Sequence, residues 1–99
     1  MNINEFQKTC VEAVNDVDKK LRINHDNQTT IMHLIEEFGE IARQINNPKL
    51  NRDKINKENL EEEIADVVLL ISKLADNNKI NIEKSVKNKI EKLKQRHNI

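Results

Sequence analysis

Apolar residues recur every three or four positions along four segments of the chain, which is the spacing of helices with one apolar face. The predicted helices span about residues 4–22, 30–46 and 57–76, with a fourth from residue 82 onward. Thr30 and Asn81 are the predicted N-caps of the second and fourth helices, because short polar side chains there accept hydrogen bonds from free backbone N–H groups. The pattern therefore predicts an all-α fold, a four-helix bundle.

The amino-acid composition also indicates a helical protein and excludes several other classes of protein. One Gly and one Pro among 99 residues leave too few turns for a β-sandwich or barrel. The single cysteine, Cys10, excludes an intrachain disulfide and is predicted to be a small core residue. The length predicts one domain, residues 1–99. No apolar run approaches a membrane span and no signal peptide is visible, so we expect a cytoplasmic protein that contacts no membrane.

The third predicted helix carries an apolar stretch, Val67 to Ile71, that leaves no polar face. Such a helix is normally buried on all sides. A single chain of four helices cannot cover all of it, so Leu69 and Leu70 are predicted to contact a second subunit. We therefore expect a homo-oligomer, a dimer or tetramer, built around this helix.

Acidic residues border the apolar stripes of the second and third helices at equivalent positions. The segment from Leu34 resembles the segment from Leu60 at an offset of 26 residues. On a helix, residues three apart lie about 60° apart, so each segment places two acids on one edge of its stripe. These acids are Glu37 and Glu40 in the second helix and Glu63 and Asp66 in the third. If the stripes pack in an antiparallel hairpin, the four carboxylates converge.

Four converging carboxylates repel one another and take up protons unless a cation neutralises them. Oxygen ligands favour hard cations, so Mg²⁺ is the expected ion and Mn²⁺ a substitute. Mg²⁺ recruits phosphate oxygens, and metal ions polarise a phosphoryl group and activate water. The pattern predicts a metal site for a phosphate-ester substrate. Solvent-exposed helix surfaces carrying ordinary charge are the alternative.

The charge distribution agrees with a polyanionic ligand. The 17 basic and 17 acidic residues give zero net charge, which argues against a nucleic-acid binder. Residues 77–99, however, carry seven basic and two acidic groups, or +5. Lys89, Lys92 and Arg96 border the apolar stripe of the last helix, where they can reach bound phosphates or simply remain surface charges.

The acidic pattern resembles the signature of MazG-like nucleoside triphosphate pyrophosphohydrolases. Glu36-Glu37-x-x-Glu40, then 22 residues, then Glu63-x-x-Asp66 carry the resemblance, which covers about residues 31–97. It implies an all-α fold and a dimer or tetramer around the motif helices. It also implies hydrolysis of a nucleoside triphosphate between its α and β phosphates, to the monophosphate and pyrophosphate, in control of nucleotide pools.

The resemblance also assigns roles to residues. It makes Glu37, Glu40, Glu63 and Asp66 the Mg²⁺ ligands, and it matches Glu36 to an acid that orients or deprotonates the attacking water. Lys92 and Arg96 are similar to a late Lys-aromatic-x-x-Arg stretch, with Leu93 in place of the aromatic residue. The chain has no Trp or Tyr, so no residue is identified that stacks on the base.

Two other functions stay open at this point. Phosphoribosyl-ATP pyrophosphohydrolase of histidine synthesis has a similar length and acidic pattern, but usually follows its Glu-x-x-Asp with an aromatic-His pair where this chain has Val67-Val68. A non-enzymatic helical interaction module would not need acids along two apolar stripes. His33 lies on the same edge as Glu37 and is either a neighbour of the metal ligands or an ordinary surface residue.

Overall fold

The computed structural model describes all 99 residues and contains helices and no strand. The four α-helices are α1 (Ile3–Leu21), α2 (Asn27–Asn46), α3 (Lys57–Asn77) and α4 (Ile82–His97), and a short 3-10 helix, η1 (Pro48–Leu50), follows α2. The predicted all-α class with four helices is confirmed. None of the helices combines the length and the apolar character that crossing a membrane requires.

A polar side chain caps the start of each long helix. Asn2, Asp26, Asn56 and Asn81 each accept a hydrogen bond from the backbone N–H three residues later. Asn81 is the predicted cap of α4, but the prediction for α2 was wrong. Its cap is Asp26 rather than Thr30, because an Asp26 carboxylate oxygen accepts from Thr29 N at 2.8 Å. Thr30 is fully buried inside the first turns of α2, where its hydroxyl donates to the His25 carbonyl oxygen.

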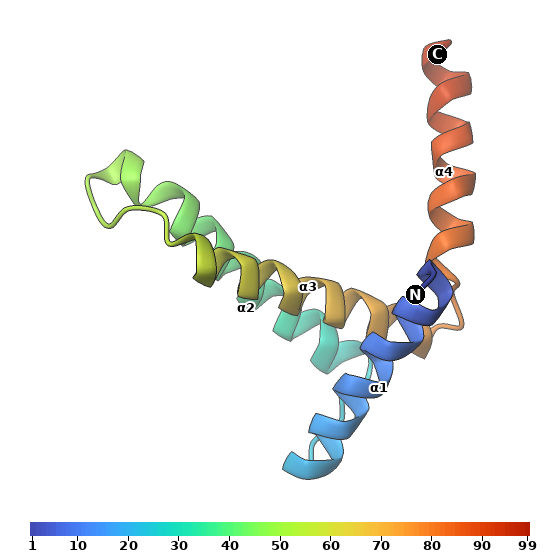
Figure 1. Cartoon of the computed structure of the whole chain (residues 1–99), viewed down its shortest axis with the longest axis horizontal. Coiled ribbons are helices and arrows are strands. Elements are labelled where there is room, and N and C mark those ends of the chain that lie inside the picture. The colour runs from blue at the N-terminus through green and yellow to red at the C-terminus, as the bar shows by residue number, and fades with distance from the viewer.

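The core lies where three helices meet. α2 and α3 form a long antiparallel hairpin, and α1 crosses the end of that hairpin against α3 (Figure 1). Six apolar residues are buried there: Cys10, Val11 and Val14 of α1, Leu34 of α2, and Leu70 and Ala75 of α3. Cys10 is thus a core residue, as predicted. The core is small, since only ten of the 99 residues are buried.

The side of α3 that faces the chain's own core differs from the prediction. Leu70 is only 4% exposed, because α1 and α2 both pack on the side of α3 that carries it. Leu70 is therefore a core residue and the prediction that it contacts a second subunit was wrong. Leu69 is half-buried. The apolar side chains that α3 leaves exposed are Ile64, Val68 and Ile71.

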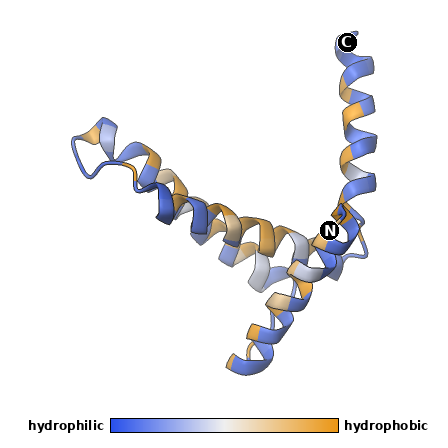
Figure 2. Ribbon diagram, in the orientation of Figure 1, coloured by the Kyte–Doolittle hydropathy of each residue, from blue (hydrophilic) through white to orange (hydrophobic).

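The last helix extends away from the other three. α4 leaves the body near the start of α1 and projects as a separate arm (Figure 1). Gln7 fixes its base, donating to the Ile80 carbonyl oxygen and accepting from Ile82 N, both at 2.9 Å. No residue of α4 is buried, and its apolar stripe is open along the arm (Figure 2). Within one chain, α4 does not close a bundle over the hairpin.

Candidate metal centre

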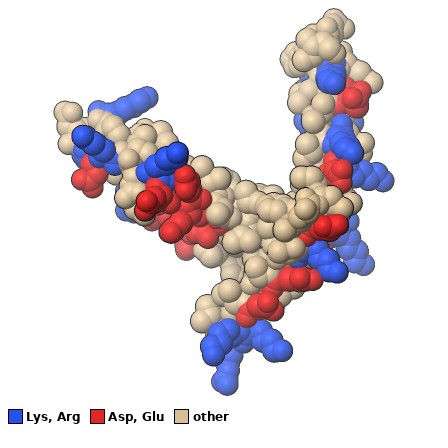
Figure 3. Space-filling model, viewed as in Figure 1, with Lys and Arg blue, Asp and Glu red and all other residues tan.

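Three of the four predicted metal ligands come together in the middle of the α2–α3 hairpin. Glu37 of α2 and Glu63 and Asp66 of α3 each offer a carboxylate oxygen, and these oxygens lie within 4.8 Å of one another. The antiparallel packing of the two apolar stripes places their acidic edges on the same side. In the space-filling view, acidic side chains gather on the α2–α3 hairpin with basic side chains beside them (Figure 3).

Glu40 lies one turn further along α2, at the border of this group. Its negative charge acts on Glu37, but its own carboxylate is engaged by Arg43 in an ion pair. Glu40 therefore lies next to the cluster formed by Glu37, Glu63 and Asp66, but its carboxylate turns to Arg43. That cluster and Glu40 are called the carboxylate centre below.

Glu37 is the most perturbed residue of the carboxylate centre. Its side chain is 14% exposed, and its Oε2 atom is buried with no hydrogen-bond donor. A hydrogen bond shared with Glu63, burial, and the negative charges of Glu63, Asp66 and Glu40 raise the pKa of Glu37 to about 7. Two carboxyl groups can share such a bond only when one of them is protonated. The donor set fits a hard divalent cation, which would replace that proton and satisfy the orphaned oxygen.

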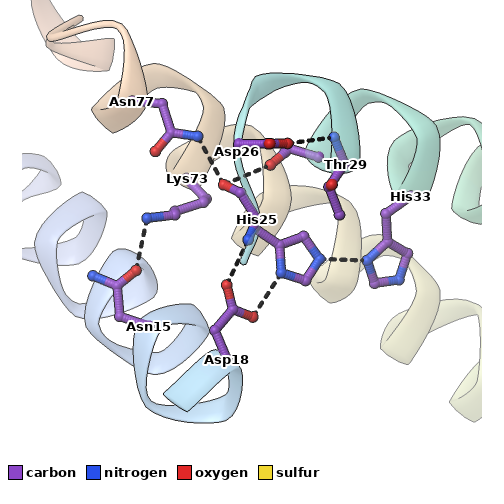
Figure 4. A network of polar contacts seen from close by, with 9 residues as sticks. Asn15, Asp18, His25, Asp26, Thr29, His33, Lys73 and Asn77 are labelled. Atoms are coloured by element: carbon purple, nitrogen blue, oxygen red, sulfur yellow. Dashed lines mark hydrogen bonds and ion pairs between the residues drawn. The ribbon is translucent and has the colours of Figure 1, made fainter. Parts of the chain in front are cut away.

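A line of polar residues leads from His33, beside the carboxylate centre, through His25 to Asp18 of α1. Figure 4 shows these three side chains. His33 Nε2 lies 3.4 Å from Glu37 Oε1, and His33 Nδ1 lies 2.9 Å from His25 Nε2. His25 Nδ1 in turn lies 2.7 Å from Asp18 Oδ1. Sequence reasoning placed His33 near Glu37 but missed Asp18 and His25. Their contact depends on the turn after α1, where Arg22 adopts a left-handed conformation that no sequence pattern predicted.

A cavity of about 230 Å³ opens on one side of the carboxylate centre. Asp66 forms part of its wall, together with the two histidines and Asp18 of the polar line. Most of the remaining lining is apolar and comes from Val14, Val17, Leu69 and Leu70. The cavity is thus a largely apolar space directly beside a carboxylate of the centre.

An open polar recess lies on the other side of the carboxylate centre. Glu40 and Glu63 line it, and so do three cations, Arg43, Arg52 and Lys54. The remaining lining, Gln44, Asn47, Asp53, Asn56 and Asn59, is also polar. The first turn of α3 faces this recess, and helix N-termini favour anions. Sequence reasoning missed the three cations, although their position between the two acidic motifs was a signal that could have found them.

The other predicted site residues lie apart from the carboxylate centre. Lys89, Lys92 and Arg96 are exposed on α4, which leads away from the hairpin within the chain (Figures 1 and 3). Glu36 is exposed on α2, about 100° around the helix from Glu37. The structure therefore does not bring these four residues to the acids of the same chain.

Comparison with known proteins gives one match. A family model described as the MazG nucleotide pyrophosphohydrolase domain matches residues 25–99. The comparisons with curated proteins and with solved structures give no match. The matched range contains α2, α3 and α4 and therefore the whole carboxylate centre, whereas α1 precedes it. On this match over three quarters of its length, the chain belongs to the MazG nucleotide pyrophosphohydrolase family.

Proposed function

We propose that the protein hydrolyses a nucleoside triphosphate between its α and β phosphates, releasing the nucleoside monophosphate and pyrophosphate. The observation that carries the proposal is the order of three environments along the molecule. The carboxylate centre lies between a largely apolar cavity and a polar recess that contains Arg43, Arg52 and Lys54. A nucleoside triphosphate has the same order, with a flat base at one end, a polyanionic tail at the other and the scissile bond between them.

The centre would hold Mg²⁺, with Mn²⁺ as a substitute, through Glu37, Glu40, Glu63 and Asp66. The close approach of three carboxylates and the donorless Glu37 Oε2 support this assignment. When bound, Mg²⁺ supplies positive charge to the phosphoryl oxygens and lowers the pKa of water. On binding the ion, the Glu40 carboxylate would leave its ion pair with Arg43. The Arg43 guanidinium would then be free to bind a phosphate oxygen.

The chain's own residues orient the substrate around this centre. Val14, Val17 and Leu69 offer the base an apolar surface, which suits a chain without Trp or Tyr. Arg52 and Lys54 would bind the β and γ phosphates and stabilise the pyrophosphate as it leaves. Glu36 is proposed to orient or deprotonate the attacking water on the strength of the family motif alone, because its exposed side chain lies apart from the centre.

We propose further that the protein is a homodimer or homotetramer. A compact monomer of 11.6 kDa exposes about 5,800 Å², whereas this chain exposes 7910 Å². Its radius of gyration is 16.2 Å, against about 13 Å for a compact domain of this length. The apolar side chains that α3 and α4 leave open support coverage by further copies, among them Ile64, Val68, Ile71, Val86, Ile90 and Leu93.

An oligomer also bears on the basic residues of α4. Lys89, Lys92 and Arg96 cannot reach the carboxylate centre of their own chain, because α4 leads away from it. As phosphate ligands they would act on the centre of another copy. The proposed unit of function is residues 1–99, since α1 supplies one wall of the cavity. Its proposed role is control of nucleotide pools in the cytoplasm.

A pyrophosphate-release assay tests this function. Wild-type protein with Mg²⁺ is given a panel of common and modified nucleoside triphosphates, with phosphoribosyl-ATP included. Pyrophosphate and a nucleoside monophosphate in equal amounts support the proposal and rank the substrates. Activity on phosphoribosyl-ATP alone assigns the protein to histidine synthesis. Inactivity on the whole panel contradicts the proposal and favours a helical interaction module.

A further inference from the structure

The polar line from α1 to the carboxylate centre begins at a buried pair, Asp18 and His25. Both carboxylate oxygens of Asp18 accept from His25, Oδ2 from its backbone N–H at 2.8 Å and Oδ1 from its ring Nδ1 at 2.7 Å. Nδ1 of His25 therefore carries a proton. A second hydrogen bond joins His25 Nε2 and His33 Nδ1 at 2.9 Å. With His33 Nδ1 as the acceptor of that bond, the ring proton of His33 lies on Nε2. The remaining nitrogen of His33, Nε2, is consequently the one that faces Glu37.

The line is also rigid. Asp18 and His25 are both 7% exposed, and burying an ionised carboxylate is costly unless its oxygens are hydrogen-bonded. The imidazole rings of His25 and His33 meet edge to edge through the hydrogen bond between them, with centroids 5.2 Å apart and planes inclined by 25°. The His25 carbonyl oxygen is held as well, by the Thr30 hydroxyl and by Asn77 of α3. The ring of His25 is thus held at both of its nitrogens (Figure 4).

The line leaves little hydrogen-bonding capacity for a ligand. The side chains of Asp18, His25 and His33 line the cavity, but both oxygens of Asp18 and both nitrogens of His25 are already engaged. The one end of the line that reaches another functional group is His33 Nε2, 3.4 Å from Glu37 Oε1. The polar line therefore serves the carboxylate centre and not the cavity.

We propose that His33, held by His25 and Asp18, is a positioning residue that fixes the Glu37 carboxylate for a divalent cation. His33 engages Oε1 and leaves the buried Oε2, which has no donor, for the ion. Groups that hold a ligating carboxylate in one orientation raise metal affinity, because the ligand is not ordered at the moment of binding. This inference rests on the proposed metal-dependent function.

The test is a Mn²⁺ titration followed by electron paramagnetic resonance of the free ion, with no nucleotide present. His33 is half-exposed on α2, so we expect the His33→Ala variant to fold. His97→Ala, at an exposed position on α4, is the matched control. We expect His33→Ala to weaken Mn²⁺ binding about tenfold or more and His97→Ala to leave it unchanged. Asp18→Ala, which touches neither the ion nor Glu37, weakens it in the same direction.

Two results would overturn the inference. One is equal Mn²⁺ affinity in the wild type and His33→Ala. The other is a raised KM with unchanged Mn²⁺ affinity, which would assign His33 to the bound base. If either result is found while the wild-type protein binds Mn²⁺ and hydrolyses nucleotide, the positioning role of His33 is contradicted and the proposed function is not. A wild type that binds no Mn²⁺ contradicts the proposed metal centre itself, and the positioning role with it.

Discussion

A carboxylate oxygen of Glu37 in α2 and one of Glu63 in α3 lie within 4.8 Å of each other across the hairpin. Two ionised carboxylates repel each other at this distance, and the pKa of Glu37 is raised to about 7, so the pair holds a proton below that pH. The shared proton and the proposed cation therefore compete for one place. This competition relates acidity, stability and metal binding in the protein.

Metal binding is predicted to stabilise the fold through Glu63. For the wild type, Mg²⁺ or Mn²⁺ at 100 times its dissociation constant adds about 2.7 kcal/mol to the free energy of unfolding. Glu63→Gln removes one carboxylate and should abolish this gain in thermal melting. The control is Glu62→Gln, an exposed neighbour on the same helix, which should respond to metal like the wild type. Equal gains in both variants would place the cation elsewhere.

The shifted pKa of Glu37 predicts a pH dependence of stability in the metal-free protein. The pKa is about 7 in the fold and 4.5 for an unperturbed glutamate, so between these values the folded state binds more protons than the unfolded state. The free energy of unfolding therefore falls as the pH rises from about 4.5 to about 7. Denaturant melts across this range measure it, and Glu37→Gln should flatten this contribution. If the free energy of unfolding of the wild type depends on pH no more than that of Glu37→Gln, the raised pKa of Glu37 is contradicted.

Metal affinity should follow the opposite course. A cation displaces the proton held by Glu37, so Mn²⁺ binds more tightly as the pH rises toward 7 and the dependence then levels off. Calorimetry in buffers of different ionisation enthalpy counts the protons released. We expect release near pH 6 and much less near pH 8. Equal release at both values would show that Glu37 is not the titrating group.

The helices and their acidic edges were predictable because both are local. A period of three to four residues placed all four helices, and the shared offset of the two motifs placed Glu37, Glu63 and Asp66 on facing edges. Leu70 was not predictable in the same way. Which side of an all-apolar helix meets its own chain depends on where α1 docks, and the sequence of α3 does not contain that information.

The rest of the site depends on loops and turns. His25 meets Asp18 because the chain reverses after α1, and α2 begins at Asn27 instead of near Thr30. Arg52 and Lys54 reach the recess because the connection after η1 folds back beside α3. Neither arrangement follows from helical periodicity. The basic residues of α4 matched a family pattern, but the direction of that helix was not predictable from it.

The cations of the recess are predicted to matter for the phosphate tail. Replacing both Arg52 and Lys54 by Gln removes two charge-assisted contacts, each worth about 1.5–3 kcal/mol, so kcat/KM for a nucleoside triphosphate should fall by about a hundredfold or more. Inhibition by added pyrophosphate should weaken as well. The matched control, Lys19→Gln with Lys20→Gln at the end of α1, should leave both quantities unchanged. Unchanged inhibition in the recess variant would exclude these residues from the pyrophosphate site.

The two apolar positions of α3 should respond differently to substitution. Leu70→Ala opens the core and should cost about 2–5 kcal/mol of stability. Ile71→Lys leaves the core of one chain intact, because Ile71 is 39% exposed, but it places a charge on the proposed subunit contact. We expect sedimentation velocity to show an oligomer for the wild type and a smaller species for Ile71→Lys. A monomeric wild type would contradict the proposed assembly.

The most direct test of the central claim identifies the products by phosphorus NMR. Wild-type protein, Mg²⁺ and one nucleoside triphosphate accepted in the pyrophosphate-release assay are followed beside the Glu63→Gln variant. Cleavage between the α and β phosphates at the carboxylate centre predicts nucleoside monophosphate and pyrophosphate from the wild type, and unchanged substrate with the variant. Nucleoside diphosphate and inorganic phosphate, or equal turnover by both proteins, would contradict it.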